Sequence, residues 1–480
     1  MSATQHLFPD VSQTPSIQRD EITATIGKSW DELFGMDWDE RRIFQFAAAK
    51  RRFDEQVPQL KALKSQVDRL GITGIAAIED LVPLLFHDSV YKSYPVSLIE
   101  KNRFDLLTRW LVGYTTLDLS AVDVRGCERV DDWLAALDEQ TQLRIIHTSG
   151  TTGKLAFFPR STLELEVWFE SFTKSHEGFG AEAGVKLGGE GGVRLPVIFP
   201  TARYGRYVAQ RNLRFLESRV APAPEQLYTL NHGTLSADLV SLSGRIRVAQ
   251  AKGELAQMTL PQPLRLAMRQ YLEDVERRPQ ESADFFQRIT AELRGKRVFV
   301  SATSNILYQA ASAGLERGMK NVFAANSVGM SGGGGKGISL PGNWLDVVRE
   351  FTGISRWKMT YGMSELVGVM PMCDEGHYHV PPFYISFLLE PESGAVLPSE
   401  GTTTGRYAFF DLLAQTNWGG IVTGDKLTID WDAKCPCGRK GPRIHSDIAR
   451  YSAEVTGEDK VTCAATVDNT DAALQQLLAV

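Results

Sequence analysis

The spacing of apolar residues predicts helices in the first part of the chain. In Glu40–Ala47, and again around Leu60–Leu70, apolar positions recur at helical intervals. The same spacing continues through Phe104–Leu137, where Trp110 and Trp133 belong to the apolar set. These patterns predict a mostly helical region over residues 1–90 and further helix after it.

From residue 143 the pattern changes to short apolar runs that alternate with helical segments. The strands predicted there are Leu143–Ile146, Arg297–Ser301 and Trp357–Tyr361. The helices predicted between them begin near Ser161 or occupy Ile306–Met319 and Gly342–Phe351. Such alternation is typical of an α/β sheet with crossover helices.

After residue 380 the apolar runs are separated by glycine and proline rather than by helices. Ile385–Leu389, Gly405–Leu413 and Ile421–Trp431 predict strands of a β-rich subdomain. We therefore divide the chain into four parts: a helical region at 1–90, an α/β core at 91–380, the β-rich subdomain at 381–450 and a short remnant at 451–480.

Composition narrows the class of protein. The 480 residues carry a net charge of −6, so the strong basic field of a nucleic-acid-binding protein is missing. No apolar run approaches the roughly 20 residues needed to span a bilayer, and the first residues do not resemble a secretory signal. Five cysteines, an odd and sparse set, argue against a disulfide framework. We expect a cytoplasmic enzyme without nucleic-acid or membrane partners.

One segment has the composition of a phosphate-binding loop. It consists of Thr148, Ser149, Gly150, Thr151, Thr152, Gly153 and Lys154. Glycines let backbone N–H groups approach phosphate oxygens, and the hydroxyls and the lysine add donors. It is not a Walker loop, because two residues rather than four separate the glycines and Leu155 follows the lysine. The alternative is that this segment is a polar surface turn without a ligand.

Three motifs in order resemble the ANL superfamily of adenylate-forming enzymes, which includes acyl-CoA synthetases, peptide-synthetase adenylation domains and luciferases. The first is the Thr148–Lys154 loop. The second, Tyr361–Glu365, resembles the aromatic-Gly-x-Thr-Glu motif, with Ser364 in place of threonine. The third is Thr423-Gly424-Asp425. The resemblance implies an α/β fold with a large ANL-type N-terminal domain, the β-rich subdomain and a much shortened C-terminal region.

The resemblance also implies roles for residues in these motifs and for Arg450, which lies after them. Lys154 would act on the phosphates of ATP, and Glu365 would bind Mg²⁺. Asp425 would accept hydrogen bonds from the ribose hydroxyls, and Arg450 would contact ribose or phosphate. The adenine would lie against Tyr361. The run Gly332–Gly335, which includes Gly333 and Gly334, would line the adenine and acyl pocket, and Gly362 and Ser364 would also take part in nucleotide binding. Alternatively, Asp425 is a turn residue and Arg450 an ordinary surface charge.

A group of Cys and His residues suggests a metal site beside these motifs. Cys435 and Cys437 are one residue apart, and Cys373 precedes His377 and His379 on another segment. Structural Zn²⁺ takes four Cys or His ligands, so we predict a site of Cys373, His379, Cys435 and Cys437, with His377 as a substitute for His379. The alternative is that the cysteines are buried as small apolar residues.

The same segments resemble two branches of the superfamily. The Cys435–Arg439 block is similar to phenylacetate-CoA ligases, whereas His379–Pro382, Ala408–Leu413 and Gly441–Arg443 resemble LuxE-like acyl-protein synthetases. The latter implies that an aryl or fatty acid is activated as acyl-AMP with release of pyrophosphate. The acyl group then passes to a thiol, here Cys463, before a reductase partner receives it.

Three alternatives to an acyl-protein synthetase that uses Cys463 stay open. An aryl- or fatty-acyl-CoA ligase would use CoA as the acceptor. A degenerate nucleotide-binding protein would catalyse nothing. Cys463 has its own alternative, a buried strand cysteine.

Overall fold

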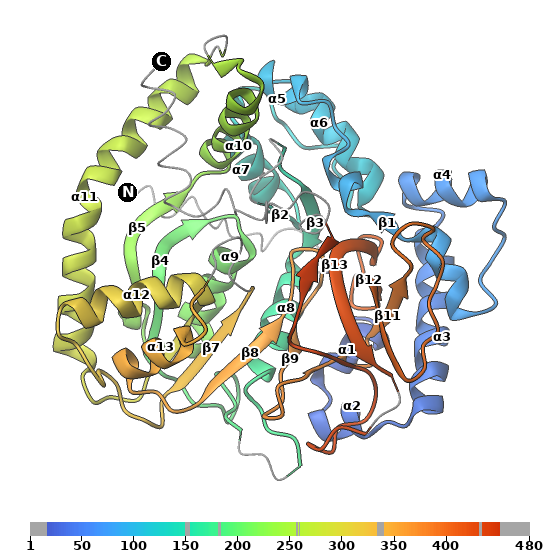
Figure 1. Cartoon of the computed structure of the whole chain (residues 1–480). Coiled ribbons are helices and arrows are strands. Elements are labelled where there is room, and N and C mark those ends of the chain that lie inside the picture. Colours follow the sequence, from blue (N-terminus) through green and yellow to red (C-terminus); the bar gives the residue numbers. More distant parts are fainter. Residues whose placement is uncertain are drawn as a thin grey trace.

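The computed structural model shows a mixed α/β protein built around two large sheets (Figure 1). It describes residues 17–148, 154–180, 184–255, 258, 260–333, 340–431 and 434–451. The mixed α/β class expected from the sequence is confirmed. Among the described helices, none combines the length and apolar composition that crossing a bilayer requires.

The helices before residue 145 cluster on the C-terminal sheet and on the β2–β3 hairpin. They are α1 (Glu21–Ala24), η2 (Thr25–Gly27), α2 (Trp30–Gly35), α3 (Trp38–Gln56), α4 (Lys61–Leu70), η3 (Ile78–Leu84), η4 (Asp88–Lys92), α5 (Ser97–Glu100), α6 (Phe104–Leu111), η5 (Val112–Tyr114) and α7 (Val130–Gln140). The later helices are α8 (Thr162–Lys174), α9 (Val208–Phe215), η6 (Leu216–Val220), η7 (Pro224–Gln226), α10 (Ala237–Lys252), α11 (Gln262–Leu293), α12 (Ser304–Glu316) and α13 (Trp344–Thr352).

The first sheet, called here the parallel sheet, has the strand order β5-β4-β6-β7-β8-β9. Its strands are β4 (Val197–Gly205), β5 (Leu227–Leu235), β6 (Phe299–Thr303), β7 (Val328–Gly332), β8 (Trp357–Tyr361) and β9 (Met370–Pro371), and only β9 runs antiparallel to its neighbour.

The second sheet, called here the C-terminal sheet, has the order β10-β14-β13-β12-β11. Its strands are β10 (Tyr378–His379), β11 (Tyr384–Leu389), β12 (Thr402–Asp411), β13 (Gly420–Asp430) and β14 (Arg443–Ile444). β1 (Phe86–His87) and β15 (Ala449–Arg450) also pair with β13. A separate hairpin joins β2 (Leu143–His147) to β3 (Phe157–Ser161).

Alternating side chains of the parallel sheet fill two different cores, as the two-residue period of a strand requires. Val197 and Phe299 pack with α8 and α9 on one face. Ile198 and Val300 pack with α11, α12 and α13 on the other. This sheet is therefore the middle of three layers, which explains why its strands are short apolar runs rather than alternating ones.

Helix α3 is held to the C-terminal sheet by buried polar side chains as well as by apolar ones. Arg41, Gln45, Arg52 and Gln56 are buried at helical spacing. They donate hydrogen bonds of 2.8–3.1 Å to the carbonyls of Val380, Pro382, Leu412 and Ala414, respectively. The predicted helix is confirmed. Of the apolar residues within Glu40–Ala47, Phe44 and Phe46 pack against the core, whereas Ile43 is 71% exposed.

Candidate active site and metal centre

The glycine-rich loop connects the two strands of the β2–β3 hairpin. Thr148 closes its base: the Thr148 N–H donates to the Ala156 carbonyl at 3.2 Å, and the Thr148 hydroxyl accepts from the Ala156 N–H at 3.1 Å. Of the residues predicted to bind the nucleotide, Ser149, Gly150, Thr151, Thr152, Gly153 and Gly334 lie outside the described residues, as does Cys463.

Lys154 follows the loop and is anchored to η4. Its Nζ donates to the Lys92 carbonyl at 2.9 Å and lies 5.1 Å from the centroid of the Tyr94 ring. The other end of η4 carries Asp88, whose charge acts on the Glu365 carboxylate. This single turn of helix therefore connects the loop lysine with the neighbourhood of Glu365.

Tyr361 and Asp425 join the two sheets. Tyr361 ends β8 at the carboxyl edge of the parallel sheet, and Asp425 lies within β13. The Tyr361 hydroxyl donates to Asp425 Oδ2 at 2.6 Å, and Arg450 Nε lies 2.9 Å from Asp425 Oδ1. Burial, together with the Asp425 charge, raises the pKa of Tyr361 well above its usual value, so this phenol remains a donor.

The carboxyl edge beside Tyr361 is lined by glycine. Gly332 ends β7, and a Cβ there would lie 2.7 Å from Thr360 Oγ1, so a side chain does not fit. Gly333 has φ +77°, which glycine tolerates best. Gly362 is similarly confined, since a Cβ would lie 2.9 Å from the Val369 side chain. Carboxyl edges of open α/β sheets are where ligands generally bind.

Glu365 is a half-buried carboxylate in the loop between β8 and β9. Burial raises its pKa; Arg450 acts in the opposite direction, and Asp425 and Asp88 raise it further. Within the described part of the chain, no side chain donates a hydrogen bond to it. A carboxylate in this state is suited to a hard cation, which would replace the missing hydration.

Arg160, which sequence analysis missed, fixes the peptide of Glu365. It is 2% exposed on β3, and its Nη2 donates to the carbonyls of Ser364 and Glu365 at 3.1 and 2.6 Å. Its Nη1 donates to Asn417 Oδ1 at 3.0 Å. The only signal in the sequence was an arginine inside the otherwise apolar segment that follows the loop.

Asp411 and Ser171, also missed, hold the next turn of the same loop. Asp411 accepts from the Val367 N–H at 2.6 Å, and the Ser171 hydroxyl accepts from the Val369 N–H at 3.0 Å. Burial raises the pKa of Asp411 to about 6. The loop that carries Glu365 is therefore fixed by side chains from β3, β12 and α8.

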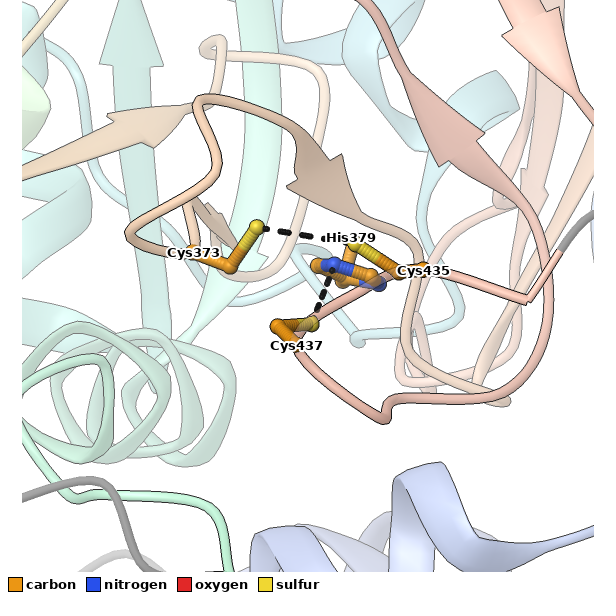
Figure 2. A group of neighbouring side chains, drawn as sticks. All are labelled: Cys373, His379, Cys435 and Cys437. Atoms are coloured by element: carbon orange, nitrogen blue, oxygen red, sulfur yellow. Dashed lines mark hydrogen bonds between the residues drawn. The ribbon is translucent and has the colours of Figure 1, made fainter.

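The four predicted metal ligands lie together, with their ligand atoms within 4.8 Å of one another (Figure 2). Cys373 Sγ and Cys435 Sγ are 3.9 Å apart, and Cys437 Sγ is 3.4 Å from His379 Nε2. A tetrahedral zinc ion, with bonds of about 2.3 Å to sulfur and about 2.0–2.1 Å to nitrogen, sets edges of about 3.8 and 3.6 Å. The cluster has the dimensions of such a site.

The predicted substitute, His377, does not belong to this cluster. It lies in a neighbouring group with Asp430 and His445, and Asp430 already accepts from Arg443 Nε at 2.9 Å. Spacing in the sequence could not predict which of His377 and His379 joins the cluster. The direction of each side chain depends on the short strand β10, which contains His379 but not His377.

Without a metal, the pKa values of the three thiols are shifted in different directions by their surroundings. Burial raises the pKa of Cys373, and it raises the pKa of Cys435 to about 12. Burial also acts to raise the pKa of Cys437, but hydrogen bonds from the backbone and side chain of Arg439 outweigh it, and the pKa is lowered. A bound cation would hold all three as thiolates.

The geometry defines an α/β protein with a site at the junction of two sheets. Comparison with known proteins finds distant similarity to solved structures. No protein-family model and no curated protein matches the chain. A 2-hydroxyisobutyryl-CoA ligase, solved with 2-HIB-AMP and CoA, aligns at 11% identity and TM-score 0.47, over 92% of this chain and 80% of that one.

Two other solved structures align over less of their own length. ATP-bound MatB from Rhodopseudomonas palustris aligns at 15% identity and TM-score 0.33, over 66% of this chain and 48% of that one. The amide bond synthetase McbA from Marinactinospora thermotolerans aligns at 15% identity and TM-score 0.31, over 72% and 57%, respectively. Likeness at these scores says nothing about chemistry, which must be argued from the site.

Proposed function

We propose that this protein is an ATP-dependent adenylate-forming ligase that converts a carboxylic acid to its acyl-AMP and transfers the acyl group to a thiol. The observation that carries the proposal is the constellation of Tyr361, Asp425 and Arg450 where the two sheets meet, with Glu365 in the next loop. Tyr361, Glu365 and Asp425 also occur in motifs that resemble those of adenylate-forming enzymes.

Asp425 is equipped to hold a ribose. A carboxylate offers about four acceptor positions, and here one is filled by Tyr361 and one by Arg450. The remaining positions suit the two adjacent hydroxyls of a ribose. The guanidinium of Arg450 pairs with Asp425, and it also brings a positive charge to the place where an α-phosphate would lie.

In the first step a carboxylate oxygen of the substrate attacks the α-phosphorus, and the bond to the bridging oxygen breaks as pyrophosphate leaves. Lys154 and the loop amides would neutralise the phosphates, which requires Nζ to exchange the Lys92 carbonyl for a phosphate oxygen. Glu365 would hold Mg²⁺, which offsets the negative charge of two anions brought together. Positioning and electrostatics then supply most of the catalysis.

In the second step a thiolate attacks the acyl carbon and AMP leaves. The acceptor favoured by the resemblance to acyl-protein synthetases is Cys463, from which a reductase could take the acyl group. A CoA ligase would instead use free CoA. For the Cys/His cluster we propose a structural Zn²⁺, because three sulfurs and one nitrogen in a tetrahedral arrangement suit that ion.

The test is acid-dependent exchange of pyrophosphate into ATP across a panel of aryl and fatty acids. Glu365→Gln and Lys154→Met should each lower exchange by at least about 100-fold, as expected when one preorganised charge is removed. The matched controls Glu400→Gln and Lys64→Met change exposed residues and should not affect it. If every acid on the panel gives no exchange while ATP still binds, the chain is a nucleotide-binding protein and the proposal fails.

The acceptor is decided by labelled acid with and without CoA. Acyl label that stays on the wild-type protein and disappears in Cys463→Ala supports the acyl-protein synthetase. Free acyl-CoA with no labelled protein supports the CoA ligase.

A further inference from the structure

Arg41 is a buried cation without a matching anion. It is 0% exposed on α3, and its Nη1 donates to the Val380 carbonyl at 2.8 Å. Its Nε and Nη2 are buried with no hydrogen-bond partner, and among the described residues no carboxylate forms an ion pair with it. A guanidinium removed from water at such a position is strongly unfavourable unless a negative charge lies nearby.

Arg41 packs on the backbone of two segments that carry metal ligands. Val380 directly follows His379, and Gly441 lies four residues after Cys437. A Cβ on Gly441 would lie 2.5 Å from Arg41 Nη2, so this backbone packs directly on the guanidinium.

We propose that the Cys373, His379, Cys435 and Cys437 cluster binds zinc as an anionic centre and that Arg41 is its buried counter-cation. Three thiolates and one neutral imidazole around a divalent ion leave a net charge of −1. Arg439, which is 4% exposed and hydrogen-bonds Cys437, shares that charge with Arg41. The inference rests on the zinc ion proposed above, and it is independent of the adenylation chemistry.

The proposal gives the metal centre a defined mechanical role. Its ligands come from the segment after β9 of the parallel sheet, from β10, and from the segment after β13. The N-terminal helices dock on the same spot: the Phe34 ring of α2 lies 5.6 Å from the His379 ring, and the Phe34 carbonyl accepts from the Lys440 N–H at 2.9 Å. Zinc therefore fastens α2 and α3 to both sheets, and Arg41 supplies the electrostatic part of this attachment.

The experiment compares zinc release to a chromophoric chelator from full-length wild type, Arg41→Met, Arg41→Lys and the control Arg51→Met. Arg51 lies on the same helix but is exposed, with 41% of its side chain in water. We expect Arg41→Met to release zinc roughly 10–100-fold faster, as when an outer partner of a metal ligand is lost. Arg41→Lys should fall between it and wild type, and Arg51→Met should match wild type.

Hydrogen exchange of the wild-type protein supplies a second readout that needs no variant. Removing zinc should increase exchange in α2 and α3 while α11, on the far side of the parallel sheet, stays protected. The proposal is overturned if the purified protein binds no stoichiometric zinc, if Arg41→Met releases zinc at the wild-type rate, or if α2 and α3 remain protected without the metal. Pyrophosphate exchange in the same samples reports on adenylation separately.

Discussion

Replacing Arg160 tests whether the hairpin that carries the glycine-rich loop also positions Glu365. Arg160→Met removes the four hydrogen bonds of a buried guanidinium, the longest of them 3.4 Å to the Pro159 carbonyl, and leaves the carbonyls of Ser364 and Glu365 without this donor. Hydrogen bonds to a charged group are worth about 1.5–3 kcal/mol each. Relaxation recovers part of the sum, so we expect the free energy of unfolding to fall by about 3–5 kcal/mol, the range for breaking one side of a buried charged interaction.

Urea unfolding measures this loss, and pyrophosphate exchange as a function of Mg²⁺ measures the displacement of Glu365. We expect exchange to fall by about 100-fold, since small misplacements of a catalytic group have effects of that size. Arg160→Lys keeps the charge and should recover part of both quantities. The control Arg125→Met alters an arginine that is 90% exposed and should change neither. Wild-type stability in Arg160→Met, together with an unaltered Mg²⁺ dependence, would refute the reasoning.

Three further predictions concern the same junction. Asp425→Asn should weaken nucleotide binding by about 10–100-fold in calorimetry, because one charged acceptor for the ribose is lost; an unchanged Kd would contradict the proposed role. Gly368→Ala should lower the free energy of unfolding by about 1–3 kcal/mol, because φ is +139° and a Cβ would lie 2.4 Å from Tyr384 Oη, whereas the unconfined Gly342→Ala should not. Burial raises the pKa of Asp411 from 3.8 to about 6, so the folded state binds the Asp411 proton more tightly than the unfolded state does. The protonated carboxyl therefore stabilises the fold below pH 4, and this stabilisation is lost as pH rises to about 6. Relative to Asp411→Asn, wild type should therefore lose roughly 3 kcal/mol across that interval in urea unfolding; no relative change would argue against a raised pKa.

The sequence predicted those parts of the fold in which local pattern and tertiary burial agree. Strands β8, β11 and β13 and helices α8, α12 and α13 were found within a few residues of their bounds. Strands β4 and β5 and the 32-residue helix α11 were missed. Polar residues at the carboxyl ends of β4 and β5 obscure their apolar runs, and α11 is largely a solvated surface with its apolar contacts widely spaced.

Some residues of the candidate site could be predicted from the sequence, and others could not. Chemically distinctive residues such as Cys373 and Cys435 could be grouped from the sequence, because few side chains share their chemistry; their role in binding zinc stays a prediction. Arg160 could not be found in that way. Its function depends on a contact with residues more than 200 positions away, which no local pattern encodes.

Helix α3 shows the limit of hydrophobic periodicity most clearly. Besides Ala48, Ala49 and Phe53, its buried residues are two arginines and two glutamines, which a hydrophobic pattern assigns to solvent. The acceptors for these polar side chains are backbone carbonyls, and these leave no trace in the sequence because every residue has one.

Those polar side chains also set an order of events during synthesis. The carbonyls that receive Arg41 and Arg52 lie 339 and 360 residues later in the chain. At roughly 5–20 residues per second, a ribosome needs on the order of tens of seconds to deliver them. Throughout that delay α3 must keep its cations and amides in water. If these arginines and glutamines were apolar, a larger hydrophobic surface would be exposed to aggregation for the whole interval. The polar residues that make α3 hard to recognise from the sequence therefore also protect it until the C-terminal sheet has been synthesised.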